Sequence, residues 1–260
     1  MKILITTDNE GVCGVSRSED TESPATRKQL VAEVNATIEG ILRASPSAEM
    51  VVIDGHGGGS LGCNISREDL NHAARLLDGR RGTEIPQVVL AEHFDALFCV
   101  GVHAMAGTPQ GNLNHTISSD HFYNVQLNGV AVGEAGLLAA IAGEKNIPLA
   151  FLTGDHWACQ EITALLPHVQ TVAVKKGLNR FCAIHEATDK VGKLIRDGAA
   201  HTISNLSRAV PYHTKHPVEL AVDYLYSNQA DHAVLRGARR TGNRSVLITA
   251  ECVADALSRM

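Results

Sequence analysis

The feature that most constrains the fold of this chain is a regular alternation of short apolar runs with segments of helical spacing. Residues 25–43, 66–78 and 133–145 carry apolar side chains at a period near 3.6 residues, which indicates amphipathic helices. The expected strands are five β-branched or aliphatic runs: Lys2–Thr7, Glu49–Ile53, Ala96–Val102, Ile147–Thr153 and Gln170–Val174. Because such alternation builds βαβ units, the sequence predicts an α/β fold with a mostly parallel sheet flanked by helices. The apolar share of 44% with only 4% aromatic residues agrees, since buried parallel strands are rich in Val, Leu and Ile.

Two regions depart from this alternation. Residues Phe122–Val132 are predicted to form an antiparallel hairpin, because Asn128-Gly129 separates two strand-like runs and is a strong turn signal. After residue 180 the expected order is a helix (His185–Leu206), a strand (Val218–Tyr224), a helix (Gln229–Gly237), a strand (Ser245–Ala250) and a last helix. We therefore expect a main α/β domain over residues 1–180. Residues 181–260 would form a smaller C-terminal α+β region, either a second domain or an extension of the first.

Charge and cysteine usage limit the partners and the compartment. The formal net charge of -5 gives no reason to expect nucleic acid or an anionic membrane as a partner. The six cysteines include no C-x-x-C pair, which fits reduced thiols. The apolar run at the start is too short for a secretion signal, and no apolar stretch reaches membrane-spanning length. We therefore expect a cytoplasmic protein.

Side chains that bind metals occur where each of the first three predicted strands ends. Asp8 and Glu10 lie two residues apart in extended chain, so they project together and repel each other unless a cation lies between them. His56 follows the second strand, and His103 follows the third. In open α/β sheets ligands bind outside the carboxyl ends of the strands. The sequence therefore predicts a metal site at this edge of the sheet.

Each of these residues also has a plainer interpretation. Asp8 and Glu10 could open the next helix or lie in solvent, and a single histidine is more often structural than a ligand. The glycines at 57–59 could cradle a phosphate, but they lack the Lys-Ser/Thr of a P-loop and the G-x-G-x-x-G spacing. The recurrence at three successive strand ends favours the metal site.

Two later residues enlarge the ligand set. His115 lies in a loop, and Glu134 opens the predicted helix near residue 135. Three carboxylates with two or three imidazoles suit zinc, with manganese or cobalt as substitutes. One catalytic zinc needs only three protein ligands, whereas two ions about 3.5–4 Å apart that share a carboxylate would use five. The ligand count therefore favours a pair of metal ions.

Five motifs appear in a fixed order along the chain. They are Thr6-Thr7-Asp8-Asn9-Glu10-Gly11, Asp54-Gly55-His56, Gly101-Val102-His103-Ala104, His115-Thr116 and Val132-Gly133-Glu134-Ala135-Gly136. In order and spacing, over at least residues 1–180, this set resembles the bacterial zinc D-aminopeptidase family, the DppA-type metallopeptidases. Two departures from the family pattern are Thr6 in place of serine and the different loop 105–113, which would border the substrate.

The resemblance implies a role for each matched residue. Asp8 would bridge two zinc ions, with Glu10 and His103 completing the shell of one ion and His56 and Glu134 that of the other. His115 would be the catalytic histidine, acting as general base, as acid to the leaving amine, or as partner of the oxyanion. The resemblance also implies a ring-like homo-oligomer that admits only short peptides.

The sequence thus predicts a dinuclear zinc aminopeptidase, a metal-dependent hydrolase. It would cleave the N-terminal amide bond of short peptides, including those with D-amino acids, by metal-activated water. Two alternatives remain open. One is a dinuclear amidase or phosphoesterase that acts on a non-peptide substrate, and the other is a non-catalytic module that binds metal or nucleotide.

Three further residues are weaker candidates. Lys175 and Arg180 could bind a substrate carboxylate, Arg180 by a bidentate fork, although surface charge is the plainer interpretation. Asp155 follows the fourth predicted strand, and its carboxylate could orient a liganding histidine.

Overall fold

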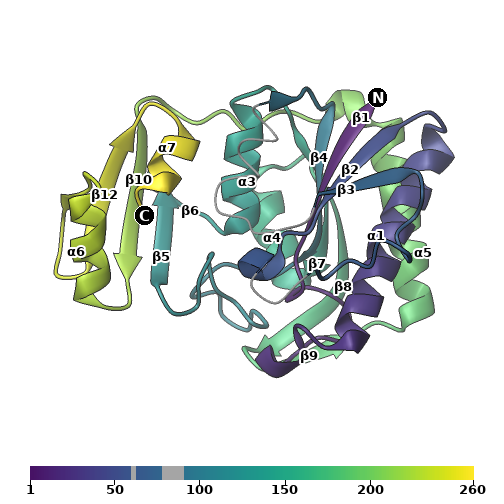
Figure 1. Cartoon of the computed structure of the whole chain (residues 1–260), viewed down its shortest axis with the longest axis horizontal. Coiled ribbons are helices and arrows are strands. Elements are labelled where there is room, and N and C mark those ends of the chain that lie inside the picture. The colour runs from purple at the N-terminus through teal and green to yellow at the C-terminus, as the bar shows by residue number, and fades with distance from the viewer. Residues whose placement is uncertain (60–62, 78–90) are drawn as a thin grey trace.

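The computed structural model describes residues 1–59, 63–77 and 91–260, and within them the chain forms two sheets (Figure 1). The larger sheet has the order β3-β2-β1-β4-β7-β8-β9. Its strands are β1 (Lys2–Thr7), β2 (Glu49–Ile53), β3 (Ala74–Leu77), β4 (Ala96–Val102), β7 (Leu149–Asp155), β8 (Gln170–Asn179) and β9 (Cys182–His185). All neighbouring strands in it run parallel except β8 and β9. The predicted fold class, a mostly parallel sheet flanked by helices, is confirmed.

Helices cover both faces of the larger sheet (Figure 1). On one face lie α1 (Pro24–Ala44) and α5 (Thr188–Ser204), and near the other lie α3 (Glu134–Gly143) and α4 (His156–Leu165). Helix α1 begins after Ser23, whose side chain accepts a hydrogen bond from the backbone N–H of Thr26. It approaches α5 so closely that a Cβ at Gly40 would lie 2.4 Å from the carbonyl oxygen of Arg196. Short 3-10 turns occur at Ser18–Asp20, His56–Gly59 and Leu206–Arg208.

The smaller sheet is antiparallel and has the order β11-β12-β10-β5-β6. Its strands are β5 (Phe122–Leu127), β6 (Val130–Ala131), β10 (Val218–Tyr224), β11 (Arg239–Arg240) and β12 (Ser245–Ala250), with α6 (Ser227–Leu235) and α7 (Val253–Ser258) against it. The hairpin predicted around Asn128-Gly129 is therefore present as β5 and β6. In this sheet β5 pairs with β10, so the smaller sheet contains strands from before and after residue 180.

Two apolar cores follow from alternating side chains in the parallel strands. Ile3 and Ile5 of β1 pack with α1 and α5, whereas Leu4 faces the opposite side. The core on the side of Leu4 continues through α3 into the smaller sheet, where it includes Leu220 and Ile248. The division at residue 180 stays a prediction, but one continuous core joins the two sheets.

The strand predictions differ in their accuracy. The bounds of β1, β2, β4, β10 and β12 are those predicted, while β7 begins and ends two residues later and β8 extends to Asn179. The helix predicted over residues 66–78 is wrong for the described part. Ala74–Leu77 is instead an edge strand paired in parallel with β2. Residue 78 lies outside the described residues.

Within the described residues, no helix combines the length and apolar character needed to cross a bilayer. Figure 1 shows α3 between the two sheets, with the smaller sheet on one side and the larger on the other. Helix α3 begins at Glu134, one of the residues predicted to bind metal.

Candidate active site

The ends of β1 and β4 lie in direct contact, and this contact builds the floor of the site. The N–H of Asp8 donates to the carbonyl of Val100 at 2.9 Å, and that of Gly11 to the carbonyl of Gly101 at 2.7 Å. Gly101 has a φ of +78°, and a Cβ there would lie 2.1 Å from the carbonyl oxygen of Asp8. Glycine is therefore required for the two loops to approach this closely.

Asp8 lies between two histidines and offers one carboxylate oxygen to each. Its Oδ1 lies 3.2 Å from Nδ1 of His56, and its Oδ2 lies 3.3 Å from Nε2 of His103. Each histidine also faces a second carboxylate. His56 Nδ1 lies 2.7 Å from Glu10 Oε2, and His103 Nε2 lies 3.2 Å from Glu134 Oε1. The structure therefore brings together all five residues that were predicted as metal ligands.

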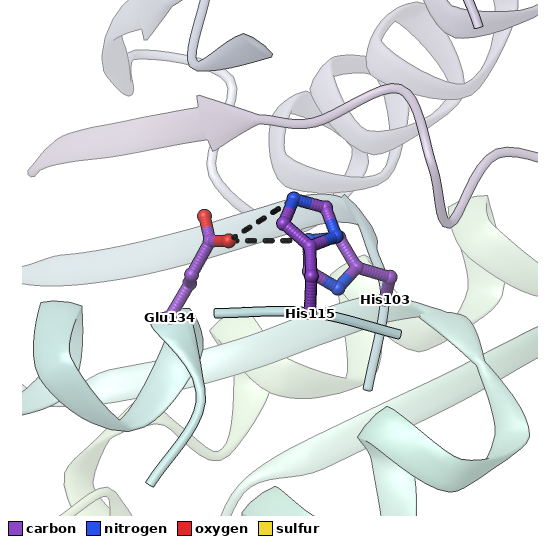
Figure 2. A group of neighbouring side chains, drawn as sticks. All are labelled: His103, His115 and Glu134. Atoms are coloured by element: carbon purple, nitrogen blue, oxygen red, sulfur yellow. Dashed lines mark ion pairs between the residues drawn. The ribbon is translucent and has the colours of Figure 1, made fainter. Parts of the chain in front are cut away.

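His115 lies on the side of Glu134 (Figure 2). Its Nε2 is 3.8 Å from Glu134 Oε1, and its ring stacks on that of His103 with centroids 3.9 Å apart and an interplanar angle of 11°. The N–H of Ile117, two residues after His115, donates to the same Glu134 oxygen at 2.8 Å. Glu134 therefore fixes the loop of His115 as well as facing His103.

Backbone carbonyls orient the two stacked rings. Nδ1 of His103 lies 2.8 Å from the carbonyl oxygen of Ala104, and Nδ1 of His115 lies 2.8 Å from that of Leu113. Since a carbonyl can only accept, each Nδ1 carries the proton, and each Nε2 turns toward the carboxylates. This is how a ring nitrogen is made available to a metal ion.

The carboxylates and imidazoles perturb one another strongly. Burial and the neighbouring charge of Asp8 raise the pKa of Glu10 to about 7. Burial alone would raise the pKa of Asp8, but the imidazoles of His103 and His56 hold it well below its usual range. Burial alone would lower the pKa of both histidines, yet the facing carboxylates raise it to about 11 for His56 and about 10 for His103. The cluster thus favours positive charge among its carboxylates.

The donor set fits a metal ion. Glu10 Oε2 is buried and accepts no well-aligned hydrogen bond within the described residues, although His56 lies near it. Two sets of three side chains each have their ligand atoms within 4.8 Å of one another. One set is Asp8, Glu10 and His103, and the other is His103, His115 and Glu134. A divalent cation would balance the negative charge of the carboxylates and so replace the protons that the imidazoles carry without it.

His115 has the opposite electrostatic tendency from its stacked neighbour. Burial, and then the charge of His103, lower the pKa of His115. Its ring is therefore neutral at pH 7, with Nδ1 protonated and Nε2 able to accept a proton. A neutral imidazole beside a carboxylate cluster suits acid–base chemistry.

The model of peptidase family M55, D-aminopeptidase, matches residues 1–260. This chain belongs to the D-aminopeptidase family. The D-aminopeptidase of Bacillus subtilis (strain 168) is 28% identical over 274 residues, which cover 100% of this chain and 95% of the relative. The solved structure of the Zn-dependent D-aminopeptidase DppA from Bacillus subtilis, a self-compartmentalizing protease, superposes with a TM-score of 0.90 at 26% identity, covering 100% of this chain and 95% of that one.

Membership in the D-aminopeptidase family confirms two predictions. The resemblance found in the motifs is real, and the chain is an enzyme, a metal-dependent hydrolase of the aminopeptidase type. How the five residues divide between two ions stays a prediction; the ligand atoms of Asp8, Glu10 and His103 lie within 4.8 Å of one another, as the expected shell of one ion requires. Glu10 lies beside His56, and Glu134 lies beside His103, with Asp8 between the two pairs.

The weaker candidates are placed as follows in this D-aminopeptidase family member. Lys175 is only 2% exposed and its ammonium group donates to three oxygens inside the protein, which argues against contact with a substrate. Arg180 Nη1 donates to the side-chain oxygen of Asn114 at 2.7 Å, next to His115. Asp155 is fully buried and accepts from the N–H groups of Asn112 (3.0 Å) and Gly177 (2.9 Å). Asp155 was predicted to orient a histidine ligand, but its carboxylate instead accepts hydrogen bonds from these two backbone N–H groups.

Two residues that hold the loops of the site, Asn112 and Glu161, were not predicted from the sequence to do so. Asn112 is fully buried and connects Lys175, Ser16 and Arg180. Glu161 accepts from the N–H of Met105 at 3.0 Å and from the hydroxyl of Thr108, and so holds the loop after His103. Nothing local marks Asn112, because an asparagine in a polar loop is ordinarily a turn residue.

Proposed function

We propose that this enzyme is a dinuclear zinc aminopeptidase that removes the N-terminal residue, with preference for a D-amino acid, from short peptides. The observation that carries the proposal is the position of Asp8, whose two carboxylate oxygens face two separate histidine–carboxylate pairs. A shared carboxylate between two ligand groups is the arrangement of dinuclear hydrolases. The zinc dependence of the Bacillus subtilis relative supports the choice of metal.

Five residues would hold the two ions. Asp8 would contact both, Glu10 and His103 would complete the shell of one ion, and His56 and Glu134 that of the other; the grouping of Asp8, Glu10 and His103 within 4.8 Å supports this division. Bound zinc supplies a water whose pKa is lowered to about 7 and a Lewis acid for the scissile carbonyl. Manganese or cobalt could substitute in a site of oxygen and imidazole donors.

His115 would move the proton of the reaction. With Nδ1 donating to Leu113, the lone pair of the neutral ring lies on Nε2, on the side of Glu134. Nε2 can therefore accept a proton when the amide is attacked and return it to the leaving amine. Stacking on His103 and the Leu113 contact hold the ring in one orientation, so it needs no rearrangement before the reaction.

We also propose that the enzyme works as a ring-like homo-oligomer in the cytoplasm. The support is a relative described as a self-compartmentalizing protease, together with cysteine usage that fits a reducing compartment. Such an assembly would admit only short peptides to the metal centre.

The test is a metal-reconstituted assay on matched D- and L-aminoacyl amides and dipeptides. We expect about two zinc ions per chain, turnover that a chelator abolishes and zinc restores, and faster turnover of the D-substrates. Size-exclusion chromatography with light scattering would measure the oligomer. A protein that carries one ion per chain, or cleaves a phosphate ester but no aminoacyl amide, would contradict the proposal.

A further inference from the structure

A buried lysine lies directly behind the metal centre. Lys175, in β8, donates from Nζ to the carbonyl oxygen of Glu10, to that of Val15 at 2.6 Å and to Asn112 Oδ1 at 2.7 Å. Three acceptors use all three protons of an ammonium group. Lys175 therefore has no proton left to donate to a further partner.

The three acceptors belong to the two loops that carry the reactive residues. Glu10 and Val15 lie in the loop after β1, residues 8–15, which we call the carboxylate loop. Asn112 lies in the loop after β4, residues 103–117, which we call the histidine loop because it ends with His115. Lys175 thus contacts both loops from a third element, β8, which lies between β7 and the edge strand β9 of the larger sheet.

Hydrogen bonds continue from Asn112 toward His115. The backbone N–H of Asn112 donates to Asp155 at 3.0 Å, and its side-chain amide donates to the carbonyl of Arg180 at 3.0 Å. The next residue, Leu113, donates its N–H to the same Arg180 carbonyl at 2.8 Å and accepts from His115 Nδ1 at 2.8 Å. A change at Lys175 would therefore reach the imidazole through two residues.

We infer that Lys175 is a positioning residue that sets the distance between the carboxylate loop and the histidine loop. It touches neither substrate nor metal but acts through the backbone of Glu10 and the side chain of Asn112. The inference rests on the proposed function of the same site. It replaces the substrate-binding role that the sequence suggested for Lys175, because a side chain 2% exposed offers no surface to a substrate.

The first test is the substitution Lys175→Met, which keeps an unbranched side chain but removes the three donated protons. We expect kcat to fall by roughly 10- to 100-fold with KM within about threefold, because the loss is in alignment. Zinc affinity, measured by competition with a chelator, should fall by about 10-fold. Lys176→Met is the matched control, since Lys176 is the exposed neighbour in the same strand, and it should leave both quantities unchanged.

A double-mutant cycle with Asn112→Ala tests the route of the effect. If Lys175 acts through Asn112, the double variant loses little more kcat than the more damaging single variant, whereas independent residues give multiplied losses. Should Lys175→Met fail to fold, Lys175→Gln takes its place in the cycle, because its amide removes the charge but still offers two donors.

Two results would overturn the inference: folded variants with wild-type kcat and zinc affinity, or multiplied losses in the cycle. The zinc competition needs no substrate. An enzyme that binds zinc but cleaves no aminoacyl amide would therefore refute the proposed activity and still decide the role of Lys175.

Discussion

Two buried charged clusters lie side by side at one edge of the larger sheet, and they balance their charges in different ways. The metal centre holds the carboxylates of Asp8, Glu10 and Glu134, which face the imidazoles of His56 and His103. The neighbouring cluster contains its own cation, Lys175, whose protons are all donated. In the first cluster, titratable imidazoles with a raised pKa supply the positive charge and can give way to a metal ion, whereas in the second an ammonium group with three fixed acceptors supplies it.

The difference indicates what each cluster is for. A lysine ammonium group is part of the chain, and with three acceptors it holds its neighbours at fixed distances. A metal ion also binds carboxylates, but it keeps coordination positions for water and substrate. The same end of the sheet can thus combine a rigid support with a reactive centre.

Removing the shared carboxylate should have the largest effect. In Asp8→Ala neither histidine–carboxylate pair retains its common ligand, so we expect loss of both ions and a fall in kcat on the order of 10³-fold or more. Elemental analysis and turnover of an aminoacyl amide would measure this. Asp120→Ala, at an exposed aspartate, is the control. Retention of both ions in Asp8→Ala would refute the bridging role.

Removing the proton carrier should spare the metal. His115→Gln is expected to lower kcat by roughly 10²- to 10⁴-fold, because positioned acid–base groups contribute about that much, while the zinc content stays at the wild-type level. The exposed His93 serves as the control in His93→Gln. Full turnover in His115→Gln would remove this residue from the mechanism, and loss of zinc would make it a ligand.

A third prediction concerns Glu33, which is not among the three acceptors of the Lys175 ammonium group. Glu33 is 1% exposed, its Oε1 accepts from the N–H of Cys13 at 2.9 Å, and its Oε2 has no hydrogen bond within the described residues. Burial raises the pKa of Glu33 to about 7. The folded state therefore retains a proton that the unfolded chain releases near pH 4.5, and stability falls as the pH rises from about 4.5 to about 7.

Glu33→Gln removes this titration. We expect the free energy of unfolding of the variant to exceed that of the wild type at pH 8 by on the order of 3 kcal/mol, and to equal it near pH 4. Chemical denaturation at both pH values would measure this, with the exposed Glu39→Gln as the control. An equal difference at both pH values would show that Glu33 does not titrate in this range.

The smallest effect is expected for an exposed ion pair that joins α1 to α5. Arg43 Nη1 lies 2.9 Å from Asp197 Oδ1, with about half of each side chain exposed. Solvent screens such a pair, so Arg43→Ala should lower the melting temperature by less than about 3 °C. A much larger shift would mean that charge at the surface stabilises this fold as much as charge in the interior.

Much of the fold was predictable because the signals are local. The strands around Ile5, Val52 and Val100 have β-branched or aliphatic side chains over five to seven residues, and their bounds were found without error. The failure at residues 66–78 has a physical reason. Leu70, Ala73, Ala74 and Leu77 recur at helical spacing, but the free edge of β2 offers backbone partners, and Ala74–Leu77 pairs with it.

The candidate metal ligands were predictable from the sequence, because Asp8, Glu10, His56 and His103 follow strands whose carboxyl ends meet at one edge of a parallel sheet. The distances between these side chains came from the tertiary structure, as did the burial of Lys175, whose ammonium group donates to a carbonyl 165 positions away along the chain. Periodicity assigns a side chain to one face of a strand, but its partners depend on how several elements pack together. That information is absent from any short stretch of sequence.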